Sequence, residues 1–205
     1  MHEIEKTITY KDTRFLTTNN LVKISVLGVL SYILMFIHFP LPIFPGFLKI
    51  DVAEVPAIIG GFALGPIPGM LIVLIKNILH FLIQTSTGGV GELSNFIIGT
   101  SYVIPAALVY HHKKDRFHAI LGVVAGIISM TAVGTISNTH LIIPFYSKIM
   151  PIEAIIKMGT VVNSRIVDIP TLVLYGITPF NLFKSSLLSL VTILIYKKVS
   201  PILKR

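Results

Sequence analysis

The stretch from Phe47 to Phe96 decides how this chain is organised. It begins FLKIDVAEVPAIIGGFALGPIPGMLIVLIKNILHFLI at Phe47 and ends STGGVGELSNF at Phe96. Charged and amide side chains lie in it among residues suited to lipid, namely Lys49, Asp51, Glu54, Lys76, Glu92 and Asn95. An ionisable group at the centre of a bilayer costs about 2.5–3.5 kcal/mol on insertion scales, so such groups usually line an aqueous cavity or pair with each other. We interpret this stretch as one wall and part of the lid of a solute pocket in a small membrane protein.

The composition supports a membrane protein. The chain has 205 residues, of which 53% are hydrophobic and 13% charged, and its mean hydropathy is +0.83. A soluble domain carries about 25% charged residues. We expect a single membrane domain over residues 1–205, with a polar cytoplasmic lead-in at 1–19 and the membrane part at 20–200. The lead-in has neither the apolar core nor the cleavage site of a signal peptide.

Apolar runs predict an all-α integral membrane protein with six transmembrane helices. The predicted spans are Leu21–Ile37, Val55–Leu64, Met70–Ile83, Leu93–Tyr110, Ala119–Ile143 and Phe180–Val199. Thr178 and Pro179 are a suitable N-cap and first-turn pair for the last span. Gly61, Gly65 and Gly69 are spaced by four, which favours tight helix packing.

Two interruptions separate these spans. Pro40, Pro42 and Pro45 forbid a continuous helix after the first span. This proline-rich segment is too apolar for a solvated loop, so we expect it to cap the pocket from outside. In the longest interruption, 144–170, the run EAIIKMGTVV predicts a short amphipathic helix at the surface.

Basic residues orient the chain. With six spans both termini lie on one side, and that side carries eleven Lys and Arg residues: Lys6, Lys11, Arg14, Lys23, Lys113, Lys114, Arg116, Lys197, Lys198, Lys204 and Arg205. The positive-inside rule makes this side the cytoplasm. The net charge of +8 is thereby explained by span flanks, so we expect membrane lipid as surroundings and no nucleic-acid partner.

Motifs of common enzymes are missing. The sequence contains no cysteine and no HExxH, GxSxG or GxxxxGK[ST] pattern. We therefore expect no ATPase site of its own, no catalytic residues and no metal site.

Several polar residues at membrane depth are candidates for lining the pocket. Lys76 and His80 share one helix face, and Lys76 either lines the pocket or pairs with Glu54 or Glu92. Glu92 is favoured in a first helical turn by the helix dipole alone, whereas Asn95 offers a two-way hydrogen-bonding amide. Asn138 is a candidate ligand contact or a polar group that ends its span.

Asn181 and Lys184 form the sharpest pair. They share one face near the predicted start of the last helix, where a cation opposes the helix dipole. That unfavourable placement indicates a ligand acceptor or an acidic partner for Lys184.

The motifs FLKIDVAEVPAIIGGFALGPIPGMLIVLIKNILH, STGGVGELSNFIIG and NLFK resemble the riboflavin-binding substrate-specific components (S-components) of energy-coupling factor (ECF) transporters in Gram-positive bacteria. The resemblance implies riboflavin as transported substrate rather than cofactor. It implies that the loop around Leu48 covers the isoalloxazine, that Asn181 and Lys184 serve ring or ribityl oxygens, and that Glu92 and Asn95 lie beside them.

The resemblance also implies partners: a transmembrane coupling protein and two cytoplasmic ATPases. S-components usually dock through an alanine-x-x-x-alanine face on the first helix. Here that helix reads KISVLGVLSYIL, so the candidate docking residues are Ser25, Gly28 and Ser31.

Two other functions stay open at this stage. One is an S-component for another vitamin. The other is an integral membrane enzyme that uses Glu54, Glu92 and His80, although the chain lacks an acidic metal motif such as DxxD.

Overall fold

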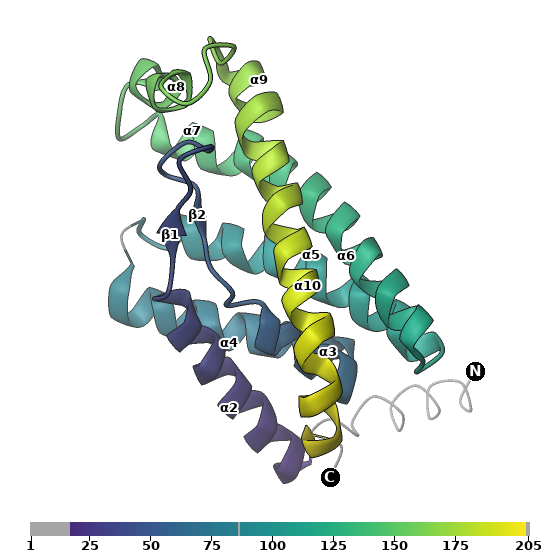
Figure 1. Cartoon of the computed structure of the whole chain (residues 1–205). Coiled ribbons are helices and arrows are strands. Elements are labelled where there is room, and N and C mark those ends of the chain that lie inside the picture. Colours follow the sequence, from purple (N-terminus) through teal and green to yellow (C-terminus); the bar gives the residue numbers. More distant parts are fainter. Residues whose placement is uncertain (1–16, 86, 204–205) are drawn as a thin grey trace, which may run out of the picture.

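The computed structural model describes residues 17–85 and 87–203, so most of the predicted lead-in at 1–19 lies outside the described residues. Helices dominate the described part (Figure 1). The main ones are α2 (Thr18–Met35), α3 (Val55–Leu64), α4 (Pro66–Gln84), α5 (Val90–His112), α6 (Arg116–Ser137) and α10 (Thr178–Leu203).

Five helical stretches of the described residues are long and apolar enough to cross a membrane, and α3 is a shorter apolar helix. The helical membrane fold is therefore confirmed in outline. At about 1.5 Å per residue the ten residues of α3 span about 15 Å, half of the ~30 Å hydrocarbon core.

Two of the long stretches are composite. After α6, the π-helical turn η2 (Asn138–Ile142) continues directly into α7 (Ile143–Tyr146). Likewise α9 (Ile169–Leu172) and the π-helical turn η3 (Val173–Ile177) run straight into α10.

The predicted start of the last helix at Thr178 is wrong. Thr178 has helical backbone angles, with φ −63° and ψ −51°, and the helix begins nine residues earlier. Its N-cap is Asp168, whose carboxylate accepts the Thr171 amide at 2.8 Å, while the Thr171 hydroxyl accepts the Asp168 amide at 3.0 Å. This reciprocal capping box satisfies two backbone donors that a helix start leaves unpaired.

The junction of α3 and α4 shows why glycines recur there. Gly65 adopts φ +123° between the two helices, a conformation that favours glycine. A Cβ on Gly69 would lie 2.9 Å from the Gly61 Cα and 2.6 Å from a Val103 methyl. The two helices therefore meet backbone to backbone, and the predicted tight packing is confirmed for Gly61 and Gly69.

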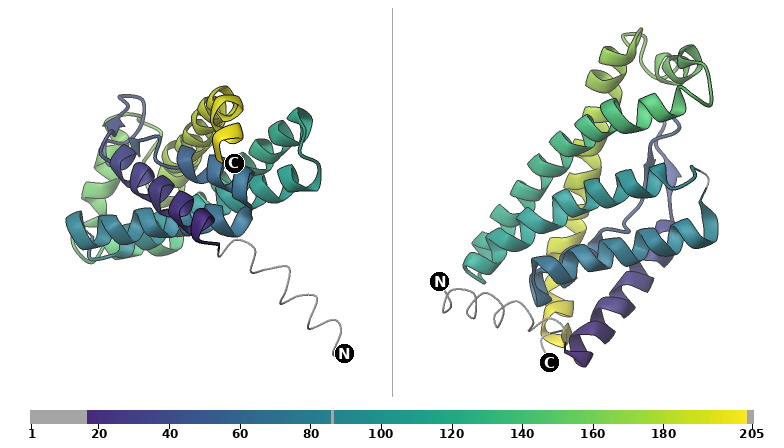
Figure 2. Two further views of the ribbon diagram at one scale, coloured as in Figure 1. Left: turned by 90° about the horizontal axis from the view of Figure 1, so that it is seen from below. Right: turned by 180° about the vertical axis from the view of Figure 1, so that it is seen from behind.

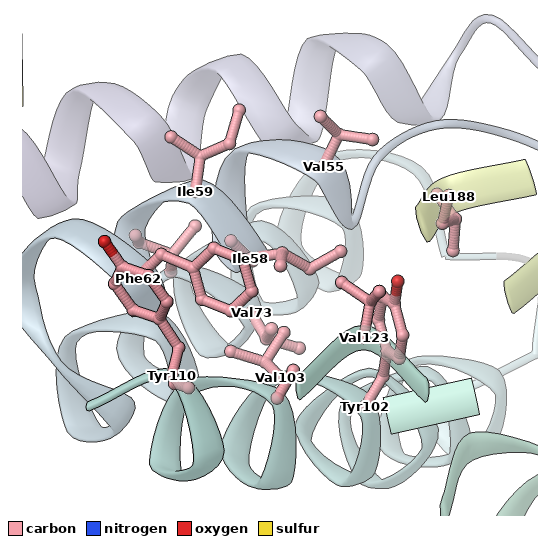
Figure 3. Packing of buried hydrophobic residues seen from close by; sticks show 14 of the residues in the cluster. Val55, Ile58, Ile59, Phe62, Val73, Tyr102, Val103, Tyr110, Val123 and Leu188 are labelled. Atoms are coloured by element: carbon pink, nitrogen blue, oxygen red, sulfur yellow. The ribbon is translucent and has the colours of Figure 1, made fainter. Parts of the chain in front are cut away.

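The main hydrophobic core lies where α2, α3, α4, α5, α6 and α10 meet. Figure 3 shows Ile58 of α3 near Val103 of α5 in the middle of this core. Tyr102 of α5 lies at one side, beside Val123 of α6, with Leu188 of α10 above them. Phe62 stacks on Tyr110 with ring centroids 4.6 Å apart.

A second core lies at the other end of α10. It joins Phe44, Leu48 and Ile50 of the proline-rich segment to Leu172, Ile177 and Phe180. Helix α8 (Ile152–Thr160), which confirms the predicted amphipathic helix, packs Ile155 into this core. The second core thus fastens the proline-rich segment and α8 to the start of the last helix.

The helix ends and the connectors form two groups, one at each end of the molecule. The start of α2, the α5–α6 connector and the end of α10 lie toward the bottom and lower right of Figure 1, and the β hairpin, the α4–α5 connector and α8 lie toward the upper left. Both further views agree with this division (Figure 2). The termini of the described part and the basic connector therefore share one end of the molecule, as the predicted topology requires.

Two of the three candidate docking residues on the first helix face the chain's own bundle. Gly28 is buried, with Ile75 of α4 only 2.6 Å from where its Cβ would stand. Ser31 is fully buried, and its hydroxyl donates to the Ala53 carbonyl at 2.5 Å. These small residues bring α2 close to its own bundle, and only Ser25 of the three is exposed.

Candidate ligand-binding cavity

A cavity of about 430 Å³ lies at the hairpin end of the bundle. Its wall combines the end of α2, the proline-rich segment, the end of α4, the start of α5, the α6–α7 stretch and one residue of α10. The lining residues are Met35, His38, Phe47, Leu48, Lys49, Asp51, His80, Thr87, Gly91, Glu92, Ser94, Asn95, Ile98, Asn138, Ile142, Tyr146 and Lys184.

The proline-rich segment contributes one wall through a short hairpin. Strand β1 (Phe39–Pro40) pairs antiparallel with β2 (Lys49–Ile50), with Phe39 opposite Ile50. Alternation along a strand sends Ile50 into the second core and leaves Lys49 exposed. Leu48, a predicted site residue, lines the cavity and is itself buried.

Lys184 lines the cavity, and its partner is Asp51. Its Nζ lies 2.8 Å from Asp51 Oδ2, and both side chains are largely buried. Asp51 Oδ1 also accepts the Ala53 amide at 3.0 Å. The pair thus joins α10 to the segment that follows β2, across 133 residues of sequence.

The reason given for the importance of Lys184 needs correction. Because the helix begins at Ile169, Lys184 lies about four turns inside it and does not oppose the dipole of a helix start. What makes Lys184 unusual is its burial in the bundle beside two carboxylates, those of Asp51 and Glu54.

Lys76 does not line the cavity. It is 1% exposed, and its Nζ donates to Glu54 Oε1 at 2.5 Å. Of the two predicted roles, pairing with an acid is therefore the one that the structure shows. The pair lies behind Lys184, whose Nζ is 3.9 Å from Glu54 Oε2.

Glu92 belongs to a second polar cluster in the cavity wall, at the start of α5. Its Oε1 lies 2.7 Å from His80 Nδ1, and its Oε2 accepts the Thr87 hydroxyl at 3.0 Å. The Thr87 hydroxyl in turn accepts the Gly91 amide at 2.9 Å. Glu92 therefore both orders the start of α5 and presents a carboxylate to the cavity.

The three predicted asparagines are placed differently. Asn95 lines the cavity and makes no side-chain hydrogen bond within the described part of the chain, so its amide is available to a ligand. Asn138 also lines the cavity, and its amide donates to the Gly134 carbonyl at 2.7 Å.

Asn181 is outside the lining. It is 4% exposed, its amide donates to the Ile177 carbonyl at 3.0 Å, and it packs against Gly134 one turn before Lys184.

His38 and Asp51 line the cavity but were not predicted as ligand contacts, whereas His80, which shares a helix face with Lys76, was a candidate for lining the pocket and does line it. The signal for Asp51 was present, since a lone acid in an apolar run requires a partner. His38 lies 3.3 Å from Lys49 across the hairpin, a proximity that depends on strand register and is not visible in the sequence.

The arrangement is that of a binding site. The three residues of the enzyme hypothesis are not assembled, because Glu54 binds Lys76 while His80 and Glu92 bind each other. Among the described side chains, no group of three or more His, Asp or Glu is placed to hold a metal ion. The cavity instead offers hydrogen-bonding groups on several walls and apolar surface from Met35, Leu48 and Ile98.

Comparison with known proteins decides the family. The family model described as "ECF transporter, substrate-specific component" matches residues 19–196. The chain belongs to this family. It is therefore a component of a membrane transport system rather than an enzyme, and the ECF resemblance drawn from the motifs is confirmed.

Individual ECF relatives cover nearly the whole chain. The riboflavin transporter RibU of Staphylococcus aureus (strain TCH60) is 32% identical over 90% of this chain and 92% of its own. The riboflavin transporter FmnP of Bacillus subtilis (strain 168) is 34% identical over 88% of this chain and 92% of its own. A solved S component of a bacterial ECF transporter superposes with a TM-score of 0.70 at 32% identity, covering 90% of this chain and 97% of that one.

Proposed function

We propose that this chain is the riboflavin-binding S-component of an ECF transporter and that the 430 Å³ cavity holds the vitamin. The observation that carries the proposal is the pair of relatives named riboflavin transporters, each more than 30% identical over about nine tenths of the chain.

The charges of the cavity suit a neutral vitamin. Riboflavin is uncharged and flat, with apolar ring faces and a polar ribityl tail. The cation Lys184 is already balanced by Asp51, and Glu92 is paired with His80. A strongly anionic vitamin would need further cations without carboxylate partners besides Lys49, an exposed lining residue whose neighbour is His38. Burying a charge without compensation is costly.

Within this proposal the ligand contacts come from several walls. Leu48 covers the ring system, Asn95 and Asn138 offer amides, and Lys184 and Glu92 bind polar atoms of the ring or tail. Asn181, which does not line the cavity, is kept as a candidate through its position one turn before Lys184.

The proline-rich segment is proposed to act as the lid. It supplies Phe47, Leu48 and Lys49 to the cavity wall, and its hairpin pairs only two residues per strand. Such a short ladder is weak by itself, so the segment is held mainly by its side chains in the second core and by the Asp51–Lys184 pair. Opening of the lid therefore requires these contacts to be released.

The orientation proposed is six crossings with the cavity facing outside. The residues that follow β2 and the short helix α3 together form the second crossing. The basic ends and connector then lie in the cytoplasm. As a member of the family of ECF substrate-specific components, the chain is proposed to work with a transmembrane coupling protein and two cytoplasmic ATPases.

The deciding experiment is ligand identification. Protein purified in detergent from riboflavin-fed cells is expected to be yellow, and stripped protein is expected to quench riboflavin fluorescence at one site per chain. Thiamine and biotin at the same concentrations serve as controls and are expected not to compete. A colourless sample that quenches no flavin, or competition by another vitamin, would show that the substrate is not riboflavin.

A further inference from the structure

Four charged side chains lie in a buried row beside the cavity. Asp51 and Lys184 face the cavity, whereas Glu54 and Lys76 are 4% and 1% exposed and do not line it. The contacts follow the order Asp51–Lys184 at 2.8 Å, Lys184–Glu54 at 3.9 Å and Glu54–Lys76 at 2.5 Å. Two carboxylates thus meet two ammonium groups, and the row carries no net charge.

The two oxygens of Glu54 are in different situations. Oε1 accepts the hydrogen bond from Lys76, whereas Oε2 is buried and has no hydrogen-bond partner among the described residues. At 3.9 Å from the Lys184 ammonium, Oε2 is too far for a hydrogen bond. Lys184 accordingly donates to Asp51 and keeps its remaining ammonium hydrogens for other acceptors.

We propose that Lys76 is a positioning residue for ligand binding: by holding and neutralising Glu54, it keeps the Lys184 ammonium directed toward Asp51 and the cavity. The inference rests on the proposed function, since it concerns how Lys184 meets the vitamin. Lys76 itself never touches the ligand.

The physical reason is competition between two acids for one cation. Without the Lys76 charge, Glu54 has an uncompensated carboxylate in a region of low dielectric, where the nearest cation is Lys184. Attraction between unlike charges is strong in such surroundings. The Lys184 side chain would then turn about 1 Å toward Glu54 to form a hydrogen bond of normal length, and its donor to the ligand would be lost.

Lys76 also makes a contact between two helices, so an experiment must separate this structural contribution from the proposed positioning role. Lys76 sits on α4, and Glu54 is the N-cap residue of α3, so the contact joins these two helices. A purely structural role for that contact predicts lower stability with unchanged affinity. The positioning role predicts lower affinity that returns when the excess negative charge is removed.

The test uses three variants of the full chain with riboflavin as the probe. Lys76→Gln keeps a hydrogen-bond donor near Glu54 but removes the charge, and is expected to weaken riboflavin binding about tenfold or more, the effect of losing one hydrogen bond to a charged group. Lys76→Arg keeps a positive charge and a charge-assisted hydrogen bond to Glu54, so the folded variant is expected to stay within about threefold of the parent. Glu54→Gln combined with Lys76→Gln removes both charges and is expected to restore the riboflavin affinity to within about threefold of the parent.

Asn77→Ala is the matched control. Asn77 is the neighbouring buried polar residue on α4, its amide donates to the Val73 carbonyl, and it does not line the cavity. Its loss changes packing without changing charge, so riboflavin affinity is expected to stay at the parent value.

Each result has a defined meaning when fluorescence quenching and ligand-free melting are measured together. Parental affinity in folded Lys76→Gln, or no recovery in the double variant, would overturn the positioning role. Failure of Lys76→Gln to fold while the double variant folds and binds would assign Lys76 to stability alone and equally overturn it. If the parent itself binds no riboflavin, the proposed function fails, and that outcome is seen before any variant is compared.

Discussion

The pair formed by Lys184 and Asp51 gives the sharpest prediction, which is a double-mutant cycle on stability and affinity. Lys184→Met removes the ammonium while roughly keeping the length of the side chain. The expected loss of riboflavin affinity is about tenfold to a hundredfold, because a hydrogen bond to a charged group contributes about 1.5–3 kcal/mol and 1.4 kcal/mol is tenfold.

Lys184→Met also leaves the carboxylate of Asp51 without its ion-pair partner. Lys184 Nζ and Asp51 Oδ2 are 2.8 Å apart, and the side chains of Lys184 and Asp51 are 11% and 13% exposed. The gross attraction between the two charges is therefore about 6 kcal/mol at an effective dielectric constant of about 20. Desolvation cancels most of this. We expect Lys184→Met to lower the free energy of unfolding by about 1–3 kcal/mol, the usual cost of leaving a buried polar group unsatisfied.

Asp51→Asn and the double variant complete the cycle. Asp51→Asn keeps an acceptor for the Ala53 amide and leaves the Lys184 charge in place, so affinity is expected to fall by less than about fivefold. The double variant is expected to bind as weakly as Lys184→Met but to be more stable than it, because no carboxylate is stranded.

Fluorescence quenching gives the affinities, and chemical denaturation without ligand gives the stabilities. If Lys184→Met binds like the parent, the cavity is not the vitamin site. If the stability losses of the two single variants simply add, the ion pair does not form.

Three further predictions concern packing, capping and topology. Gly69→Ala should lower stability by about 1–3 kcal/mol through overpacking against the backbone of α3, with riboflavin affinity of the folded protein unchanged in the quenching assay. The Thr171 hydroxyl, followed by its amide, hydrogen-bonds the carboxylate of Asp168 and holds its pKa below the ordinary value. Capping is therefore fully present above about pH 4 and is lost as the pH falls further. Protection factors of the amides at the start of α9, measured relative to the intrinsic exchange rate at each pH, should consequently fall in acid. Asp168→Asn should remove that dependence, and equal acid sensitivity in the variant would argue against it. Single cysteines at Gly88 and Lys114 should differ toward an impermeant maleimide in intact cells, with labelling at 88 only, and the reverse pattern would invert the topology.

Much of the helical layout follows from local sequence. A long apolar run between polar flanks satisfies its backbone only as a helix when it lies in lipid, so the spans were predictable within a few residues. The break at Gly65 and Pro66 and the surface helix around Ile155 were also predictable, because both depend on neighbouring residues alone.

The start of the last helix could not be placed in this way. Thr178–Pro179 is an adequate helix start by local rules, yet the chain was already helical from Ile169. The capping box at Asp168 and the π-helical turn η3 make the longer helix continuous. Which of two acceptable starts is used depends on the packing of Leu172 and Ile177 in the second core.

The direction in which small residues face was also decided by tertiary structure. A membrane helix is apolar all round, so its sequence does not separate the face toward lipid from the face toward other helices. Gly28 and Ser31 were expected to face a partner protein, but they face α4 and the segment after β2.

The sequence by itself determined that this chain crosses a membrane, where its apolar spans lie, and that buried charges near Asp51, Lys76 and Lys184 need partners. Only the tertiary structure decided the partners. Lys76 pairs with Glu54, 22 residues away, and Lys184 pairs with Asp51, 133 residues away. The physical reason is that a buried charge requires a counter-charge within about 3 Å. The sequence shows that such a partner is needed. Which acid comes within that distance is decided when the helices pack.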